Sequence, residues 1–191
     1  MVRIRRVGTE EVALARDLHN RFTAQDRSIA AIRSWYNDVP SLFLFAIEGD
    51  EAIGVCTGRS RGENTVSLAG IGVEPNRRGE GIGTELLEQF EENAREAGIE
   101  RVSVASAGGR VDGFYLENGF KPEKILVMNP AGRPRDYNRT DFDIEWGTND
   151  DGSPKCYVHV SKYDPTVVEQ VRDEFEDDHA IYIMVKDRFD Q

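Results

Sequence analysis

The amino-acid sequence predicts an α/β fold, and three observations support this class. Residues 65–73 form an apolar run that suits a buried strand, and a glycine-rich turn follows it. Residues 84–98 then repeat apolar side chains at helical spacing. Residues 101–105 again have a strand pattern, before a short helical segment and a further strand at 120–128. Strands and helices therefore alternate through the middle of the chain, as they do in α/β proteins.

The residues before this central part predict further elements in order. Residues 2–7 alternate as an edge strand does. A helix follows over residues 9–20, with its first residue, a threonine, as the predicted N-cap. A second helix is predicted around residues 28–38. Residues 42–48 and 52–60 are predicted to form the two strands of a hairpin with a tight turn between them.

The last third of the chain predicts a loop and a smaller group of elements. Residues 129–140 hold two prolines and a glycine among polar side chains, which indicates a connecting loop. Strands at 141–146, 155–160 and 180–187 and a helix at 166–177 complete the chain.

The glycine-rich turn is the most informative segment for function. Residues 73–83 read Val-Glu-Pro-Asn-Arg-Arg-Gly-Glu-Gly-Ile-Gly. A turn between a strand and a helix presents backbone N–H groups at the helix N-terminus, where the dipole adds partial positive charge. Glycines there let a ligand approach the backbone closely. The segment predicts a seat for phosphate or pyrophosphate.

Two common nucleotide motifs do not fit this turn. It lacks the Gly-Lys-Ser/Thr ending of a P-loop. Its glycines are spaced as G-x-G-x-G, whereas a dinucleotide fingerprint has G-x-G-x-x-G. The turn therefore predicts neither Mg-nucleotide chemistry nor a Rossmann site.

Two segments resemble the GNAT N-acetyltransferase superfamily. Residues 78–83, Arg-Gly-Glu-Gly-Ile-Gly, match its (Gln/Arg)-x-x-Gly-x-(Gly/Ala) signature. Residues 114–120, Phe-Tyr-Leu-Glu-Asn-Gly-Phe, resemble its FYxxxGF segment. The resemblance covers roughly residues 1–128. It implies a mixed central sheet flanked by helices, in a domain over residues 1–148 with its core motifs at 65–120.

The resemblance also implies an activity and a set of site residues. GNAT enzymes transfer an acetyl group from acetyl-CoA to a primary amine by direct attack in a ternary complex. The strand before the turn would pair with the pantetheine arm, and the turn would hold the pyrophosphate. Tyr115 would protonate the leaving thiolate, with a core aromatic beside Phe114 and Phe120 as the alternative for this residue. The implied acetyl-CoA contacts are Ile71, Gly72, Val73, Arg78, Gly79, Glu80, Gly81, Ile82, Gly83 and Thr84.

The sequence departs from the family pattern in two places. Many members carry a glutamate base on the strand before the turn, but residues 65–73 contain no carboxylate, and Glu63 and Glu74 only flank it. Gly108 stands where many relatives have an asparagine. These departures favour an alternative function, a CoA-binding regulatory module without turnover. A third hypothesis, an assembly scaffold, does not explain the glycine-rich turn.

The resemblance leaves two arrangements for the C-terminal part. The core of the family ends with a strand antiparallel to the one after Gly-Phe, and either 141–146 or 180–187 could be that strand. In the first arrangement residues 149–191 form a small β-α-β extension; in the second, residues 130–178 are an insertion. The compactness of the extension favours the first arrangement.

Charge restricts the partners. The formal net charge is −11, from 35 acidic and 24 basic residues, and such a surface disfavours nucleic acid and anionic membranes. It favours a halophilic source, with an arginine-rich proteome as the alternative. Because CoA is polyanionic, Arg77 and Arg110 are also candidate contacts, with exposed loop charges as the alternative.

Cysteine and histidine usage predicts neither disulfides nor metal. The two cysteines lie in strand-like contexts and the three histidines are scattered. The sequence shows no apolar run that could span a bilayer and no signal-peptide pattern. We therefore expect a cytoplasmic enzyme without a metal, acting on a small-molecule or peptide amine, and a homodimer is left open.

Overall fold

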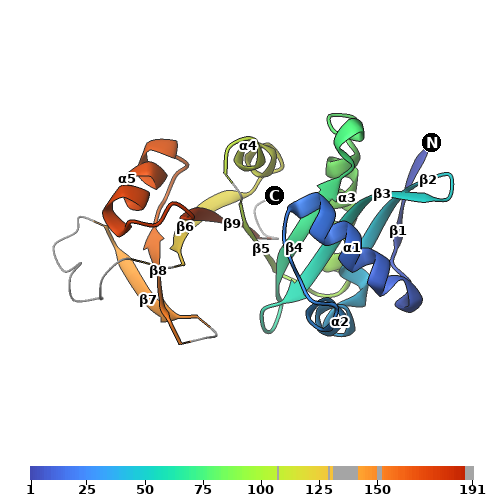
Figure 1. Ribbon diagram of the computed structural model, residues 1–191, viewed down its shortest axis with the longest axis horizontal. Coiled ribbons are helices and arrows are strands. Elements are labelled where there is room, and N and C mark those ends of the chain that lie inside the picture. Colours follow the sequence, from blue (N-terminus) through green and yellow to red (C-terminus); the bar gives the residue numbers. More distant parts are fainter. Residues whose placement is uncertain (107, 129, 131–141, 150–151, 188–191) are drawn as a thin grey trace. The chain divides into compact units, whose positions relative to one another are not determined.

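The computed structural model describes residues 1–106, 108–128, 130, 142–149 and 152–187. The chain forms two compact units, and each is described by itself (Figure 1). The first unit comprises Met1–Ser103 with Asp187, and the second comprises Val104–Lys186. Strand β5 (Arg101–Ala105) runs from the first into the second.

The first unit is built on an antiparallel run of strands. Its strands follow the order β1-β2-β3-β4-β5, and the first three neighbouring pairs are antiparallel. The predicted hairpin is confirmed, because Glu48 pairs with Glu51 across a two-residue turn. The strands are β1 (Val2–Arg6), β2 (Leu44–Glu48), β3 (Glu51–Ser60) and β4 (Thr65–Val73).

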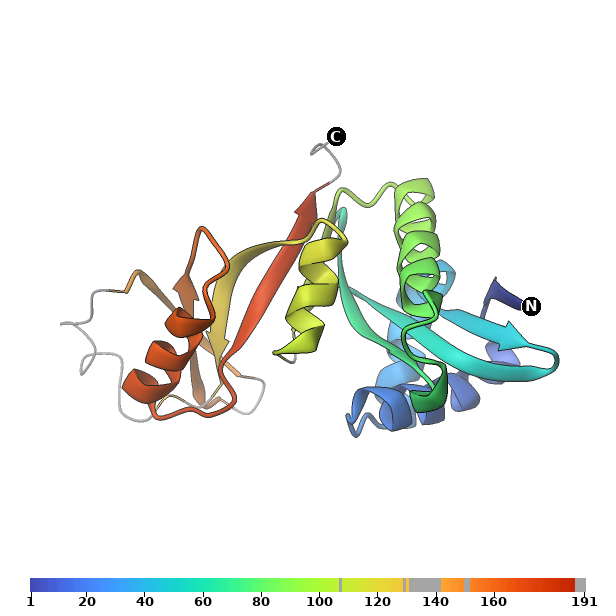
Figure 2. The ribbon, with the colours of Figure 1, turned by 90° about the horizontal axis from the view of Figure 1, so that it is seen from above.

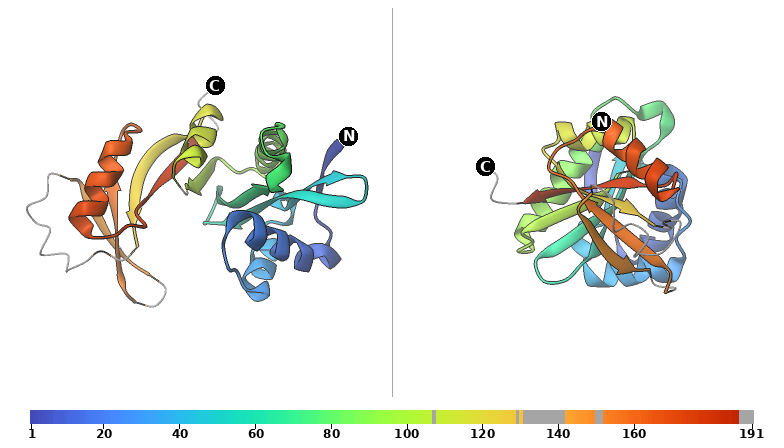
Figure 3. Two further views of the ribbon diagram at one scale, coloured as in Figure 1. Left: turned by 45° about the horizontal axis from the view of Figure 1, so that its top comes forward. Right: turned by 90° about the vertical axis from the view of Figure 1, so that its left-hand side faces the viewer.

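Helices cover both faces of this sheet. The elements are η1 (Thr9–Glu11), α1 (Val12–Thr23), α2 (Ile29–Asp38), η2 (Pro40–Leu42), η3 (Pro75–Arg77) and α3 (Ile82–Glu96). Helices α1 and α2 lie on one face and α3 lies on the other (Figures 2 and 3). Apolar side chains of α1 and α2, including Phe22 and Ile32, form a buried cluster with strand residues such as Phe45. Residues Leu86 and Phe90 of α3 are fully buried.

The predicted start of the first helix is wrong by one turn. Thr9 begins the 3-10 turn η1, whose cap is Gly8, and the α-helix begins only at Val12. The Glu11 carboxylate accepts a hydrogen bond from the Gly8 amide at 2.9 Å and pairs with Arg5. This carboxylate therefore satisfies the start of the segment in place of the Thr9 hydroxyl, which lies 3.4 Å from the Tyr36 hydroxyl.

The second unit continues from β5 with strands in the order β5-β9-β6-β8-β7. Its further elements are α4 (Arg110–Glu117), β6 (Lys121–Val127), β7 (Ile144–Thr148), β8 (Pro154–His159), α5 (Pro165–Phe175) and β9 (Ile181–Asp187). The central strand β6 is antiparallel to β9 on one side, with Ile125 opposite Tyr182, and antiparallel to β8 on the other. Strand β7 pairs with β8.

The strand pairing bears on the two arrangements of the C-terminal part. Strand β9 lies between β5 and β6, whereas β7, from the 141–146 segment, pairs with β8. The pairing therefore favours the arrangement in which the 180–187 strand follows β6 in the sheet, against the preference drawn from compactness. The two compact units also divide at residue 103 and not at 148. A functional boundary at 148 stays a prediction, and most of the predicted 129–140 loop lies outside the described residues.

Both units combine a sheet with helices, so the predicted α/β class is confirmed. Within the described part of the chain, each helix is too short or too polar to cross a membrane.

Candidate functional site

The glycine-rich turn leads from β4 into α3 through two left-handed residues. After η3, Gly79 has φ +84° and Gly81 has φ +86°. An added Cβ would meet no atom within 4 Å at either position, so the backbone conformation, not crowding, requires glycine there. Gly81 is the N-cap of α3. The predicted order of strand, glycine-rich turn and helix is confirmed.

The N-terminus of α3 presents amide groups with no acceptor in the helix. The amides of residues 82–84 precede the first intrahelical bond, which runs from the Glu85 amide to the Gly81 carbonyl at 3.0 Å. The Gly81 cap, lacking a side chain, makes no side-chain hydrogen bond to them. Together with the helix dipole, these amides favour an anionic ligand.

The two arginines of the turn have different roles. Arg77 pairs with Glu48 at the end of β2 and with Glu80, the latter at 2.9 Å. These bonds to arginine lower the pKa of both carboxyl groups. The Arg78 Nε donates to the Val73 carbonyl at 3.0 Å. Arg77 therefore connects the turn to β2, and its charge is paired with the two glutamates. The Arg78 side chain instead folds back over the end of β4.

Strand β4 contains an irregularity that the sequence analysis did not predict. Thr57 lies opposite Gly70 but Gly58 lies opposite Leu68, so Ala69 is an extra residue, a β-bulge. The Ala69 carbonyl accepts a hydrogen bond from Gln25 Nε2 at 3.3 Å. The only signal in the sequence is the pair of small residues at 69 and 70. Only Gly70 separates the bulge from the predicted pantetheine-binding residues.

The predicted pantetheine-binding residues form the last part of β4. Ile71, Gly72 and Val73 lie opposite Cys56, Val55 and Gly54 of β3. At the other end of β4, the Ser103 hydroxyl of β5 donates to the Val66 carbonyl at 3.4 Å. One edge of the 71–73 segment is thus bonded to β3.

Helix α1 packs directly against β4 at two glycines. A Cβ on Gly70 would lie 2.5 Å from His19 Cε1, and a Cβ on Gly72 would lie 2.5 Å from Phe22 Cβ. His19 is fully buried, and its Nδ1 lies 2.9 Å from the Thr57 hydroxyl. Burial lowers its pKa to about 4, so the imidazole is neutral at physiological pH. No local sequence pattern marks His19, because its burial and its contact with Thr57 depend on the packing of α1 against the sheet.

Tyr115 lies in the second unit, and residues 71–84 lie in the first. It belongs to α4 and is 4% exposed. Its ring packs edge-on against Phe114, with centroids 5.3 Å apart, and tilted against Phe120 at 5.5 Å. The turn after α4 closes on it, because the Phe120 amide donates to the Tyr115 carbonyl at 3.0 Å.

The glutamates that flank β4 and the residues at the start of α4 lie in different surroundings. Glu74 forms an ion pair with Arg21 of α1 at 3.7 Å, and Glu63 is exposed in the turn between β3 and β4. Gly108 has φ +86°, and Arg110 begins α4 as an exposed residue. Within the described ranges, no group of three or more His, Cys, Asp or Glu side chains is arranged to hold a metal ion.

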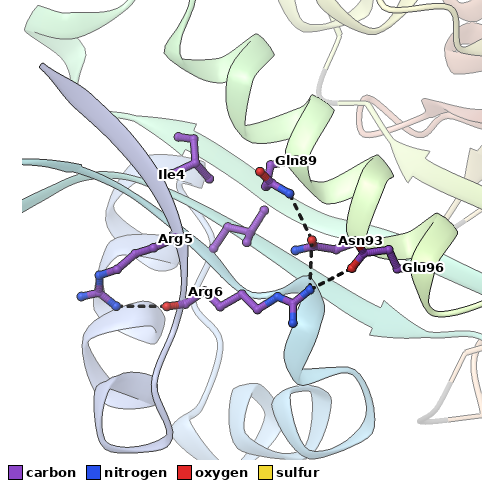
Figure 4. A pocket seen from close by; sticks show the side chains of 7 residues that line it. Ile4, Arg5, Arg6, Gln89, Asn93 and Glu96 are labelled. Atoms are coloured by element: carbon purple, nitrogen blue, oxygen red, sulfur yellow. Dashed lines mark hydrogen bonds and ion pairs between the residues drawn. The ribbon is translucent and has the colours of Figure 1, made fainter.

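A pocket of about 220 Å³ lies away from the glycine-rich turn, between β1, β2 and α3 (Figure 4). Its buried polar residue is Asn93, whose Oδ1 accepts from Arg6 and Gln89 and whose Nδ2 donates to the Ser41 carbonyl. These bonds occupy both the oxygen and the nitrogen of the Asn93 amide, so the amide holds neighbouring residues of the protein together. Its lining residues are Ile4, Arg5, Arg6, Leu44, Gln89, Asn93 and Glu96.

Comparison with known proteins identifies relatives of this chain. Amino-acid acetyltransferases from Pseudomonas aeruginosa strains and Pseudomonas paraeruginosa are 38% identical to it over 71 residues. That match covers 37% of this chain and only 16% of the relatives' length.

Solved acetyltransferases share its fold. The ribosomal-protein-S18-alanine N-acetyltransferase of Escherichia coli is similar with a TM-score of 0.59 and 16% identity, over 86% of this chain and 97% of that one. Arabidopsis thaliana Naa50, solved with a CoA-peptide bisubstrate analogue, gives 0.60 and 15% over 97% of both chains. N-acetylglutamate synthase from Neisseria gonorrhoeae gives 0.55 and 17%, over 98% of this chain and 35% of that one.

The family of this chain is shown by a match to a family model. The model described as the acetyltransferase (GNAT) family matches residues 12–120, more than half of the chain. These residues include the glycine-rich turn and the Gly-Phe segment that suggested the resemblance. The chain therefore belongs to the GNAT family of acetyltransferases.

Proposed function

We propose that this protein binds acetyl-CoA and transfers its acetyl group to a primary amine. The observation that carries the proposal is the N-terminus of α3, where a left-handed glycine cap precedes amides without an intrahelical acceptor. In the proposed complex, the amides of residues 78–84 bind the pyrophosphate of CoA. Arg78, beside the end of β4, adds positive charge near that group in an otherwise acidic protein.

The pantetheine arm would lie along the last part of β4. Backbone groups of Ile71, Gly72 and Val73 that do not face β3 would pair with the amide groups of the arm as a neighbouring strand does. The bulge at Ala69 supports this arrangement, because a bulge changes the direction of the backbone groups next to it. An N–H group of this segment would polarise the thioester carbonyl as negative charge develops on its oxygen.

The chemical step would be a direct transfer. The amine lone pair attacks the carbonyl carbon, and the C–S bond breaks as the tetrahedral intermediate collapses. Tyr115 donates its phenolic proton to the leaving thiolate, and the amine proton passes to a base or to water. The position of Tyr115 within residues 114–120, the segment that resembles the family's FYxxxGF motif, supports that role.

Two structures with a similar fold suggest the class of acceptor. Naa50 was solved with a peptide conjugate, and the Neisseria synthase with N-acetyl-glutamate. We propose that this chain likewise acetylates a small amine, an amino acid or a peptide amine.

Calorimetry and a turnover assay test the proposal together. We expect CoA and acetyl-CoA to bind, and thiol release from acetyl-CoA to rise above background with at least one member of an amine and peptide panel. Tyr115→Phe should lower kcat, most strongly at low pH, and leave acetyl-CoA affinity nearly unchanged. Tyr157→Phe, on β8, is the matched control.

Two results would contradict the proposal in different ways. Failure to bind CoA at any salt concentration at which the protein is folded would remove the family's cofactor from this chain. Binding without turnover across the panel would favour the regulatory-module alternative, for which the absence of a carboxylate from β4 is the supporting observation.

A further inference from the structure

Helix α4, which contains Tyr115, has little stability of its own. It has only eight residues, and its cap, Gly109, makes no side-chain hydrogen bond. Gly108 and Gly109 both have positive φ, and Gly113 lies inside the helix. A helix of this length with an internal glycine is marginal without tertiary contacts. Its orientation therefore depends on the residues that hold its two ends.

The first turn of α4 is held by Asp112. This carboxylate is only 3% exposed, and each of its oxygens has a hydroxyl donor. The Ser106 hydroxyl donates to Oδ1, and the Tyr163 hydroxyl donates to Oδ2 at 3.0 Å. A buried carboxylate is costly unless it is hydrogen bonded, so both donors are needed to keep Asp112 in place.

Tyr163 is itself fixed by β9. Its ring lies 5.1 Å from that of Tyr182, whose hydroxyl donates to the Asp164 carbonyl at 2.7 Å. The Tyr182 carbonyl accepts from the Ser106 amide at 2.8 Å, so one residue of β9 holds both partners of Asp112. Burial and the bond to Asp112 raise the pKa of Tyr163 to about 12, and its hydroxyl remains a donor at neutral pH.

We propose that Tyr163 and Asp112 are positioning residues for acetyl transfer: their hydrogen bond fixes the first turn of α4 and thereby the direction of the Tyr115 side chain. Asp112 and Tyr115 are three residues apart, so they share one face of the helix. The inference rests on the proposed function, in which Tyr115 protonates the thiolate. Small displacements of a reacting group lower rates steeply.

This role would connect the C-terminal part of the chain to the reaction. Tyr163 lies between β8 and α5, outside the residues 12–120 that match the family model. The segment after β6 would thus supply a support for the helix that carries the proposed acid.

The test compares Tyr163→Phe with Tyr157→Phe in the full chain. Both variants remove one hydroxyl, but the Tyr157 ring contacts the Lys124 and Lys155 ammonium groups and is not part of the Asp112 cluster. We expect Tyr163→Phe to lower kcat roughly tenfold and to leave KM for acetyl-CoA unchanged. Amide hydrogen exchange of residues 110–118 should be faster in this variant, and the control should match the wild type in both measurements.

A double variant separates positioning from general stability. If Tyr163 acts through Asp112, Asp112→Asn combined with Tyr163→Phe should lower kcat no further than Asp112→Asn alone. Wild-type kcat and exchange in Tyr163→Phe would overturn the inference, as would a uniform loss of stability with kcat unchanged. If the wild type itself turned over no amine, the proposed function would fail and the positioning role with it.

Discussion

Single residues determine the shape of the proposed anion-binding turn. Gly79 and Gly81 adopt left-handed conformations that other residues take only with strain. From the sequence, Arg77 and Arg110 were equally candidate CoA contacts or exposed loop charges. Arg77 is instead committed to Glu48 and Glu80. Glu80 is a local partner, three residues on, but Glu48 lies 29 residues away in the chain, and local sequence does not reveal that second partner.

Gly81→Ala should weaken CoA binding. A Cβ at φ +86° strains the cap by roughly 1 kcal/mol and shifts the amides that follow it. We expect a CoA dissociation constant about tenfold higher by calorimetry. Gly98→Ala, at φ +77° after the C-terminus of the same helix, should cause a similar loss of stability with unchanged CoA affinity. Equal affinities in both variants would show that the cap geometry does not matter for CoA.

His19 should make stability depend on pH between about 6.5 and 4. Its folded-state pKa of about 4 lies below the ordinary value, so the unfolded chain takes up a proton first as pH falls. The contribution of His19 to the unfolding free energy is therefore fully present above pH 6.5. It is lost as the pH falls from about 6.5 to about 4, which lowers the unfolding free energy by about 3 kcal/mol.

Urea unfolding at several pH values measures this dependence. His19→Gln should flatten the slope of unfolding free energy against pH within that window. His179→Gln, whose side chain is 88% exposed, should leave the slope unchanged. Identical slopes in the wild type and His19→Gln would assign the dependence to another group.

At the scale of elements, helix α1 packs closely against strand β4 because two residues of the strand are glycines. The glycines at 70 and 72 leave room for His19 and Phe22 of α1, and Gln25 just after α1 bonds to the bulge at Ala69. The strand itself was predicted correctly from its apolar run. The bulge was not, because it depends on the register with β3, which no property of residues 65–73 alone specifies.

Gly72→Ala should destabilise the first unit. The new Cβ would lie 2.5 Å from Phe22 Cβ and 3.2 Å from the backbone carbonyl carbon of Phe22, so α1 would have to move. We expect a loss of about 1–3 kcal/mol in unfolding free energy by chemical denaturation. Gly147→Ala in β7 is a matched strand control, because its nearest neighbour, Lys155 Cε, lies at an ordinary 3.4 Å. An unchanged midpoint for Gly72→Ala would mean that α1 adjusts freely.

At the scale of the whole molecule, negative charge is the dominant property. The net charge is −11, of which residues 129–191 contribute −7, from 8 basic and 15 acidic groups. Self-repulsion of this kind destabilises a compact state and is screened by salt. A halophilic source therefore remains a prediction that solution measurements can address.

Unfolding free energy should rise with KCl at neutral pH. Raising KCl from about 0.1 M to about 1 M shortens the Debye length from about 10 Å to about 3 Å. We expect a gain on the order of 1 kcal/mol by urea unfolding. At pH 4.8, near the calculated isoelectric point, the same change of salt should have little effect. A salt effect of equal size at both pH values would exclude screening of net charge as its cause.

The α/β class, the hairpin, the turn from β4 into α3 and the family were all predictable from the amino-acid sequence. Each of these is encoded by residues close together in the chain, as apolar periodicity or as glycines with special φ angles. Three features became visible only in the folded chain: β9 lies between β5 and β6, β4 has a bulge, and Tyr163 bonds to Asp112. These features depend on backbone pairing and on side-chain partners distant in the chain. Backbone pairing is nearly independent of residue type, and a side-chain bond needs a partner that the neighbouring residues do not identify, so local sequence carries little record of either.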